Sequence, residues 1–330
     1  MNGQMNGLSA READLATLPV IDMALLADAD PNVRAQVAGA LRAACVDSGF
    51  FYVKGHAVPP EITAVLFEQA RAFFDLPLVE KMALDINTSP VLRGYGALLS
   101  ENTDVTARGD LHEAFDIGGV LYDGAPGGHY NRFPASLPTL EPAMRAYWHQ
   151  MLRVARALTG GFALALELEA DYFAPLLTEP QAFLRVLHYP PQDTPEDGQI
   201  DPTQIGIGAH SDYESLTILA QDDNRALQVS DGRGGWLWAD PRPGMFVVNI
   251  GDQMARWTND LFRSTVHRAT NLTGRRRYSI PFFFGPNPDA VIAPLPGCAG
   301  PDRPARYGPI GAGEYSRARK AASYGGGTIP

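Results

Sequence analysis

The sequence predicts a mainly β protein with helical additions, in which a sandwich or jelly-roll core is wrapped by N-terminal helices. Two observations favour this fold class. Apolar residues at helical spacing lie in the first half of the chain, whereas short apolar or alternating runs separated by turn residues fill the second half from Phe183 onward. No internal repeat, low-complexity tract or flexible linker separates the halves, so we expect the helices to pack directly on the β core.

On this interpretation the chain has three segments. Residues 1–17 contain acidic residues and no apolar stretch, so they resemble neither a signal peptide nor a membrane anchor, and we expect a short disordered lead. Residues 18–175 are predicted to form the N-terminal helical layer, with short strands, packed on the core. Residues 176–330 are predicted to form the β core and a C-terminal tail.

The N-terminal segment is predicted to begin with a strand, a helix and a second strand. The run Leu18–Met23 is short and apolar, Asn32–Asp47 has apolar residues at helical spacing, and Gly49–Lys54 is aromatic and β-branched. A pair of prolines then opens a helix that runs from Glu61 to about Phe74.

The middle of the chain combines loops with one long helix. Residues 86–135 are rich in Gly, Pro, Asn and Asp and lack sustained periodicity, which predicts loops laid over a scaffold, a common location for substrate contacts. From about Pro138 to Ala170 the apolar and aromatic residues repeat every three or four positions. This spacing predicts one long helix whose apolar stripe packs into the core.

Seven short runs after the long helix predict the strands of the core. In chain order they are FLRVLHY, SLTILAQ, LQV, WLW, MFVVNIG, STVHRA and RYSIPFFFG. Because Gly, Pro, Asp and Asn separate them, a sandwich or jelly roll is favoured over a parallel α/β sheet. In the last run we interpret Pro281 and Phe282–Phe284 as residues that fill the barrel rather than touch a substrate.

Composition and charge exclude several function classes. The net charge of -10 argues against a protein that binds duplex nucleic acid, since such a protein needs a clustered basic surface, and the basic run Arg275–Arg277 is too short to provide one. The two cysteines, Cys45 and Cys298, are too few for a disulfide framework and lack the paired spacing of a thiolate zinc site. We therefore expect a cytoplasmic protein, and nothing in the sequence indicates its oligomeric state.

Three residues are candidates for a metal site. Of the seven histidines only His210 is followed two residues later by an acid, Asp212, and in an extended segment such residues point to the same face. This short motif is weak alone, but a glycine-rich turn before it and an apolar run after it place it at a strand end. His267 lies in another short strand 55 residues after Asp212, where an antiparallel barrel can bring it alongside. Two histidines and one carboxylate leave coordination positions open, which suits iron(II) and oxygen chemistry.

Six segments resemble, in order and spacing, the isopenicillin N synthase-like branch of the iron(II) and 2-oxoglutarate-dependent dioxygenases over about residues 18–320. They are LPVIDM, GFFYVKGH, LRVLHYPP, AHSDYESLTIL, GDQMARWTNDLFRSTVHRA and RRRYSIPFFFGPN. The resemblance implies a double-stranded β-helix core and an enzyme that uses iron(II), dioxygen and 2-oxoglutarate. It also implies that His210, Asp212 and His267 hold the iron.

The resemblance further implies a site for the cosubstrate 2-oxoglutarate. The family's R-x-S element maps onto Arg277 and Ser279, where a guanidinium can bind the distal carboxylate in a two-pronged pair and the hydroxyl adds a hydrogen bond. Tyr189 matches a tyrosine that helps to hold the cosubstrate in similar enzymes. Many plant relatives have Asn at the position of Leu187, so the local hydrogen bonding here departs from theirs.

The partner implied is a small organic substrate rather than a nucleic acid or a membrane, with release of succinate and carbon dioxide. Hydroxylation is the default outcome, and desaturation or cyclisation requires only a different fate for the substrate radical. An iron oxidase of the isopenicillin N synthase type, which does not use 2-oxoglutarate, and an ethylene-forming type of enzyme stay open. Oxygen uptake with and without 2-oxoglutarate separates these alternatives.

Two alternatives come from other classes, namely a non-catalytic metal-binding β-barrel and a zinc hydrolase. The sequence contains no H-E-x-x-H motif, and the pair Arg277 and Ser279 favours the oxygenase. Position alone suggests the walls of the substrate pocket. They are Arg93–Phe115 with Tyr95 and Glu101, the segment before Arg185, and the tail from Tyr307.

Overall fold

The computed structural model describes residues 18–103, 109–119, 130–192 and 204–325, with side chains as far as Arg319 in the last range. The predicted disordered lead, residues 1–17, lies outside the described residues. Two larger β-sheets and six α-helices make up about half of the described part of the chain, which also contains a two-stranded sheet.

The larger sheet has eight strands in the order β1-β2-β10-β7-β12-β5-β4-β3. The bounds of these strands are β1 (Val20–Asp22), β2 (Phe50–Lys54), β3 (Gly94–Gly96), β4 (Glu113–Gly118), β5 (Ala182–Tyr189), β7 (Leu216–Gln221), β10 (Phe246–Ile250) and β12 (Arg277–Phe284). Both the N-terminal and the C-terminal segments contribute strands to this sheet. The predicted division of the chain between residues 175 and 176 stays a prediction.

The smaller sheet has four strands in the order β6-β11-β8-β9. Their bounds are β6 (Ile207–His210), β8 (Leu227–Ser230), β9 (Trp236–Trp238) and β11 (His267–Ala269). Apolar clusters join residues of the two sheets, one around Val229 and Val247 and the other around Tyr189 and Ala269. The two sheets therefore face each other, as expected for the predicted jelly roll. A separate pair, β13 (Val291–Ile292) and β14 (Ile310–Gly311), lies near the C-terminal end.

The large sheet presents different residues to its two sides because side chains alternate along a strand. On β5, Leu184 and Val186 belong to the main hydrophobic core, whereas Leu187 and Tyr189 belong to a cluster shared with the small sheet. We call the side toward the small sheet the inner face and the opposite side the outer face. Arg185 has the same parity as Leu187 and Tyr189, so it lies on the inner face.

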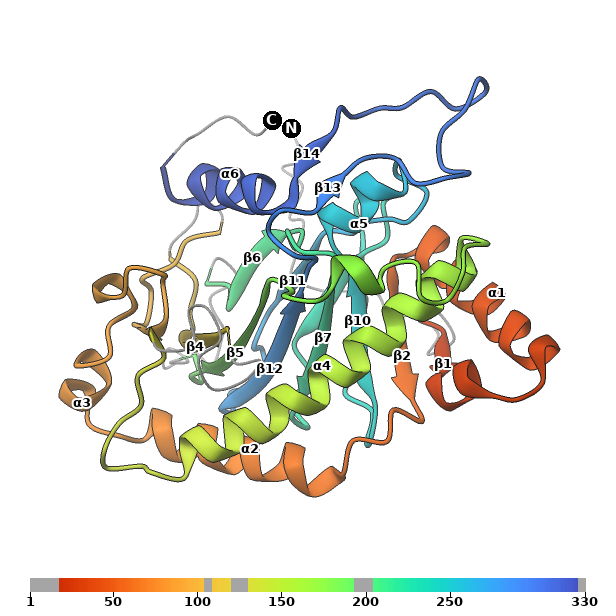
Figure 1. The fold of residues 1–330 in the computed structure, drawn as a ribbon. Coiled ribbons are helices and arrows are strands. Elements are labelled where there is room, and N and C mark those ends of the chain that lie inside the picture. Colours follow the sequence, from red (N-terminus) through yellow and green to blue (C-terminus); the bar gives the residue numbers. More distant parts are fainter. Residues whose placement is uncertain (1–17, 104–108, 120–129, 193–203, 326–330) are drawn as a thin grey trace, which may run out of the picture.

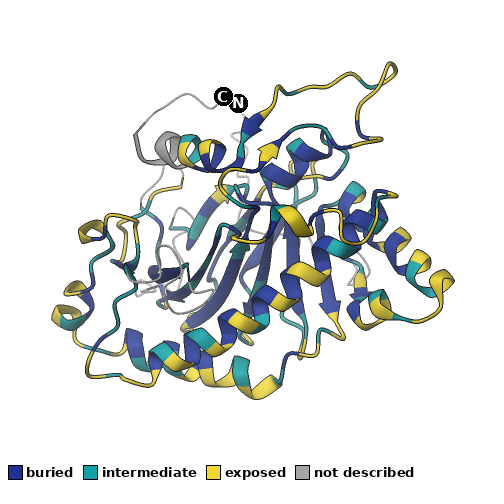
Figure 2. Cartoon of the chain, viewed as in Figure 1, coloured by how far each residue is buried: buried dark blue, intermediate teal, exposed yellow. Residues whose placement is uncertain are grey.

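Helices cover the outer face. The α-helices are α1 (Pro31–Asp47), α2 (Pro60–Phe74), α3 (Leu78–Met82), α4 (Leu140–Ala165), α5 (Asp252–Trp257) and α6 (Ala312–Gly325). Figure 1 shows α2 and α4 crossing the large sheet, and Figure 2 shows that the sheet is buried while the outward sides of the helices are exposed. Among the described residues, no helix combines the length and the apolar character needed to cross a lipid bilayer.

Local sequence explains where α1 starts. The side chain of Asp30 accepts a hydrogen bond from the backbone N–H of Asn32, and Pro31 occupies the first turn, where its missing N–H costs nothing.

The long helix predicted over 138–170 is α4, and its Met and aromatic stripe is buried as predicted.

The fold class and the strands predicted after Phe183 are confirmed, since each of the seven runs contains a strand. Two interpretations need correction. Residues 86–135 are not only loops, because β3 and the six-residue β4 lie within them. The inner-face positions of β4 carry Ala114, Asp116 and Gly118, so its apolar alternation is confined to Phe115 and Ile117 and is too short to predict a strand. The phenylalanines of β12 also divide, because Phe282 and Phe284 are fully buried in the main core and Phe283 is half-buried on the inner face.

Candidate active site

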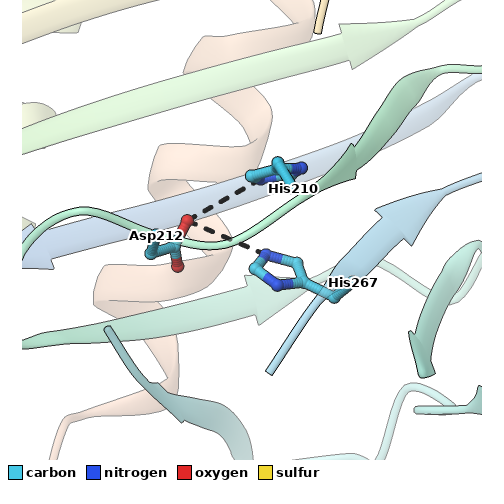
Figure 3. Close-up of side chains that lie close together, drawn as sticks. All are labelled: His210, Asp212 and His267. Atoms are coloured by element: carbon cyan, nitrogen blue, oxygen red, sulfur yellow. Dashed lines mark ion pairs between the residues drawn. The ribbon is translucent and has the colours of Figure 1, made fainter. Parts of the chain in front are cut away.

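The two predicted histidines meet across neighbouring strands of the small sheet. His210 ends β6, His267 begins β11, and the two residues are direct partners in the antiparallel register, with ring centroids 4.4 Å apart. Asp212 follows in the loop after β6. Its Oδ1 lies 3.7 Å from Nε2 of His210 and 3.8 Å from Nε2 of His267. Figure 3 shows the three side chains converging, and one potential ligand atom from each lies within 4.8 Å of the others.

Backbone carbonyls fix the orientation of both imidazoles. Nδ1 of His210 lies 2.8 Å from the carbonyl oxygen of Gly208, and Nδ1 of His267 lies 3.1 Å from that of Thr265. Because a carbonyl can only accept, Nδ1 of each ring carries the proton and donates it. The lone pair of each Nε2 is then directed toward Asp212, which is the arrangement that a metal ion requires.

The carboxylate of Asp212 is held by two donors on the inner face of the large sheet. Its Oδ2 accepts hydrogen bonds from the hydroxyl of Thr217 on β7 and from Nδ2 of Asn249 on β10, the latter at 2.7 Å. Oδ1 is left to face the two histidines. Thr217 and Asn249 were not predicted from the sequence, although each is a polar residue within an otherwise apolar strand and could have been noticed for that reason.

Electrostatics favour the protonation states that bind a metal. Burial opposes ionisation of Asp212, but the neighbouring His267 and His210 and the two hydrogen bonds outweigh it and lower the pKa of this carboxyl. Burial and the proximity of His210 lower the pKa of His267 to about 4, although Asp212 opposes the shift. Near neutral pH the site therefore presents a carboxylate and a neutral imidazole.

The loop that carries Asp212 is fixed from α5. The backbone N–H of Asp252 donates to the carbonyl of Asp212 at 2.8 Å, and that of Gly251 donates to the carbonyl of Ser215 at 3.0 Å. A Cβ atom at Gly251 would lie 2.1 Å from the carbonyl oxygen of Glu214, so only glycine permits this approach. Gly251 and Asp252 thus have a structural role at this site.

The predicted 2-oxoglutarate residues meet on the inner face of the large sheet. Arg277 on β12 and Tyr189 on β5 are direct register partners, and the guanidinium carbon lies 4.6 Å from the centre of the tyrosine ring. Arg277 donates to the hydroxyl of Ser279 at 3.3 Å and to Oε1 of Gln221 at 3.2 Å. Gln221 was not predicted as part of this group, because its place beside Ser279 depends on the register between β7 and β12.

The guanidinium of Arg277 is buried, and the carboxyl group of Asp222 acts on it electrostatically without forming an ion pair. Its side chain is among the largest that are fully buried, and within the described ranges no carboxylate lies at ion-pair distance from it. Its Nε has no hydrogen-bond partner among the described residues. A buried cation with an unpaired donor fits an anionic ligand such as a carboxylate.

A second guanidinium, that of the half-buried Arg185, has two carboxylate partners. It donates to both oxygens of Asp116 at 2.8 Å each and to both oxygens of Glu101 at 2.9 Å each. His112 also contacts Glu101, with Nε2 at 3.5 Å from Oε2. Burial opposes ionisation of Glu101, but Arg185 and His112 outweigh it and hold the pKa of this carboxyl far below its ordinary value.

Not all residues predicted for the pocket walls lie on this side of the sheet. The structure brings Arg93, Glu101 and His112 of the predicted stretch to the inner face, where they lie beside Arg185 and Asp116. Tyr95 instead lies in the main core with its hydroxyl donating to Glu113, and Tyr307 donates to Asp260.

Comparison with known proteins agrees with this geometry. A family model described as non-haem dioxygenase in morphine synthesis N-terminal matches residues 18–139, and the model of the 2OG-Fe(II) oxygenase superfamily matches residues 180–286. A 2-oxoglutarate-Fe(II) type oxidoreductase, hxnY of Emericella nidulans, is 37% identical over 320 residues, which cover 93% of this chain and 90% of the relative. The chain belongs to the 2OG-Fe(II) oxygenase superfamily.

Two further similarities concern proteins whose names or titles give a small molecule. A homoarginine-6-hydroxylase of Glycine max is 34% identical over 302 residues, which cover 86% of this chain and 89% of the relative. A solved structure of a Neurospora crassa enzyme in complex with alpha-KG and thymine is 30% identical with a TM-score of 0.84, covering 93% of this chain and 97% of that one.

This oxygenase is therefore an oxidoreductase that depends on iron(II), 2-oxoglutarate and dioxygen, and the predicted family, enzyme class and cofactors are confirmed. The donor set of two imidazoles and a carboxylate fits iron(II), and the uncompensated Arg277 fits a dicarboxylate. The iron and the keto acid supply the oxidising power drawn from dioxygen, while the protein binds and orients the reactants.

Proposed function

We propose that His210, Asp212 and His267 bind the iron(II) ion, and that Arg277, Ser279 and Tyr189 hold 2-oxoglutarate. The enzyme then oxidises a small organic molecule, with hydroxylation as the default outcome. In that case one oxygen atom of dioxygen enters the substrate as a hydroxyl group, and the other enters the succinate formed when 2-oxoglutarate loses carbon dioxide.

One observation carries the proposal for the metal. His210 and His267 are cross-strand partners whose Nε2 atoms both face Oδ1 of Asp212, while the other oxygen of that carboxylate is held by Thr217 and Asn249. Three donors on one side leave the remaining positions of an ion free for the cosubstrate and dioxygen. The uncompensated guanidinium of Arg277 supports the assignment of the cosubstrate site.

The names of the relatives support a small-molecule substrate and hydroxylation, since they include a homoarginine hydroxylase and an enzyme crystallised with thymine. Neither a nucleic acid nor a membrane is proposed as a partner, in line with the net charge of -10. We also propose a cytoplasmic location, which is supported by the two free, buried cysteines, Cys45 and Cys298.

The metal assignment is tested by Asp212→Ala. We expect a folded protein that binds iron(II) at least about a hundredfold more weakly, more than is lost when only the surroundings of a ligand are changed, because two neutral imidazoles remain. Anaerobic titration calorimetry measures the affinity, and circular dichroism checks the fold. The matched control is Asp223→Ala, which alters an exposed carboxylate, and it should bind iron like the unaltered protein. Equal affinity in both variants would remove Asp212 from the ligand set.

The activity is tested by an aerobic screen of metabolites for substrate-dependent succinate formation, with iron(II) and ascorbate supplied. Succinate should form only when 2-oxoglutarate is present and should rise with the correct substrate. Oxygen uptake that is independent of 2-oxoglutarate would contradict the proposed cosubstrate site.

A further inference from the structure

One row of register partners runs across the inner face from the proposed metal site. Asn249 on β10 pairs with Thr217 on β7, Thr217 with Phe283 on β12, Phe283 with Phe183 on β5, and Phe183 with Gly118 on β4. The first two residues hold Asp212. Because neighbouring strands lie about 4.8 Å apart, the next two residues stand beside the metal site on the same side of the sheet.

Those two residues form an aromatic surface. The rings of Phe183 and Phe283 are stacked, with centroids 4.2 Å apart and planes inclined by 16°. Both rings are only half-buried, whereas Phe282 and Phe284 on the outer face are fully buried. Apolar rings that keep part of their surface accessible next to a metal site provide a stacking surface for a flat ligand.

Glycine makes room for charged groups at the far end of this row. A Cβ atom at Gly118 would lie 2.3 Å from Nε of Arg93, so the guanidinium of Arg93 occupies the space that a side chain on β4 would fill. The guanidinium carbon of Arg93 lies 5.7 Å from the centre of the Phe183 ring. The wall beside the aromatic surface is therefore polar and charged.

The wall carries both signs of charge, with carboxylates in excess. Arg185 directs four N–H···O contacts to the carboxylates of Glu101 and Asp116. Burial lowers the pKa of Arg93, while Asp116 and Glu214 oppose the shift. Two guanidinium groups thus lie among three carboxylates, and His112 contacts one of these. An anionic ligand would have to leave water without finding a free counter-charge, which is costly.

Part of the wall remains accessible to a ligand. The side chains of Arg185 and Glu101 are 16% and 21% exposed, so the ion pairs are not sealed in the core. A guanidinium offers N–H donors and a carboxylate offers lone pairs, which means that the accessible wall presents both kinds of hydrogen-bonding group.

We propose that the primary substrate binds beside this aromatic surface as a flat ring without an anionic group, which stacks on Phe283 and presents both a donor and an acceptor to the wall around Arg185. The proposal rests on the proposed function, because it assigns the substrate of the same metal site. It excludes a free carboxylate as the main recognition feature of the substrate.

Three probes of almost equal shape test the charge preference. Benzamide is neutral, benzoate is an anion and benzamidinium is a cation, while the ring is the same. We expect benzoate to bind at least about tenfold more weakly than benzamide, as a partly screened charge at this site would require, and also more weakly than benzamidinium. Titration calorimetry at neutral pH on the full chain loaded with zinc(II) and 2-oxoglutarate gives the three affinities without turnover. Binding of benzoate as tight as that of either other probe, or no binding of benzamide at millimolar concentration, would overturn the proposal.

A variant tests the role of the charged wall directly. Glu101→Gln keeps the shape of the side chain but removes one negative charge, so the preference should shift toward benzoate by about tenfold relative to benzamide. If Glu101 had only a structural role, the affinities for all three probes would fall by the same factor. The matched control is Glu141→Gln, in which a carboxylate paired with Arg145 on the surface of α4 is altered. That control should leave the order and spacing of the three affinities unchanged.

The binding of 2-oxoglutarate to the zinc-loaded protein distinguishes a failure of the proposed cosubstrate site from a failure of the inference about the substrate. If the unaltered protein does not bind 2-oxoglutarate, the proposed cosubstrate site is wrong. If 2-oxoglutarate binds and the probes do not follow the expected order, the cosubstrate site stands and the inference about the substrate is wrong.

Discussion

Arg277 and Arg185 lie on the inner face of paired strands, yet their surroundings differ in charge. Arg185 on β5 is held by the carboxylates of Glu101 and Asp116. Arg277 on β12 contacts the neutral groups of Ser279 and Gln221 and the ring of Tyr189, and its Nε is unpaired among the described residues. Carboxylates of the protein thus pair with the positive charge of Arg185, whereas no carboxylate among the described residues forms an ion pair with Arg277.

The difference indicates two uses of a buried charge. An uncompensated buried guanidinium costs free energy in the free protein, so its retention indicates that a ligand supplies the missing negative charge. A compensated guanidinium has little left to offer a charged ligand, but it fixes the shape and polarity of a wall. We therefore expect replacement of Arg277 to affect ligand binding and replacement of Arg185 to affect stability.

The largest expected effect on stability is that of Arg185→Met. This change leaves the carboxylates of Glu101 and Asp116 buried without their partner, and the free energy of unfolding should fall by about 3 kcal/mol. Urea denaturation at neutral pH measures the loss. Arg277→Met is the contrasting variant, and it should keep or raise the unfolding midpoint, because it removes an uncompensated charge. Equal destabilisation by both changes would show that the two arginines do not differ as described.

A smaller effect, on affinity, is expected for Arg277→Lys. Lysine keeps the positive charge but loses the planar fork, so the affinity for 2-oxoglutarate should fall by about 2 to 3 kcal/mol, roughly thirtyfold to over a hundredfold. The Michaelis constant for 2-oxoglutarate should rise more than that for the primary substrate. Arg276→Lys is the control, since its side chain is partly exposed and pairs with Asp75. Unchanged dependence on 2-oxoglutarate would indicate instead that Arg277 meets the primary substrate.

The contrast between the arginines also shows which contacts could be predicted from the sequence alone. Arg277 stands in a continuous strand with a recognisable R-x-S element, so its role could be predicted from neighbouring residues. The partners of Arg185 come from a loop and from β4, which are 84 and 69 residues away in the chain. No local pattern contains that information, because the pairing of β4 with β5 determines it.

The same limit applies to the metal site. The spacing of His210 and Asp212 and the strand around His267 could be found by inspection of the sequence. Thr217 and Asn249 could not be assigned, since their contact with Asp212 depends on the order β10-β7 in the sheet. The strand β4 was missed for a related reason, because its inner-face residues belong to the charged wall around Arg185 and not to an apolar core.

The smallest effect is expected for Asn249→Ala, which alters the support of Asp212, a residue that combines features of both arginines. Like Arg277 it has neutral partners, Thr217 and Asn249, but they occupy only Oδ2 and leave Oδ1 for an ion. Asn249→Ala removes one of the two donors, so the carboxylate should keep its place but lose orientation, and iron(II) affinity should fall by about tenfold. Anaerobic calorimetry measures the change, with the exposed Asn87→Ala as control. If Asn249→Ala binds iron as tightly as the control, Thr217 alone orients the carboxylate, and Asn249 serves the packing of β10 instead.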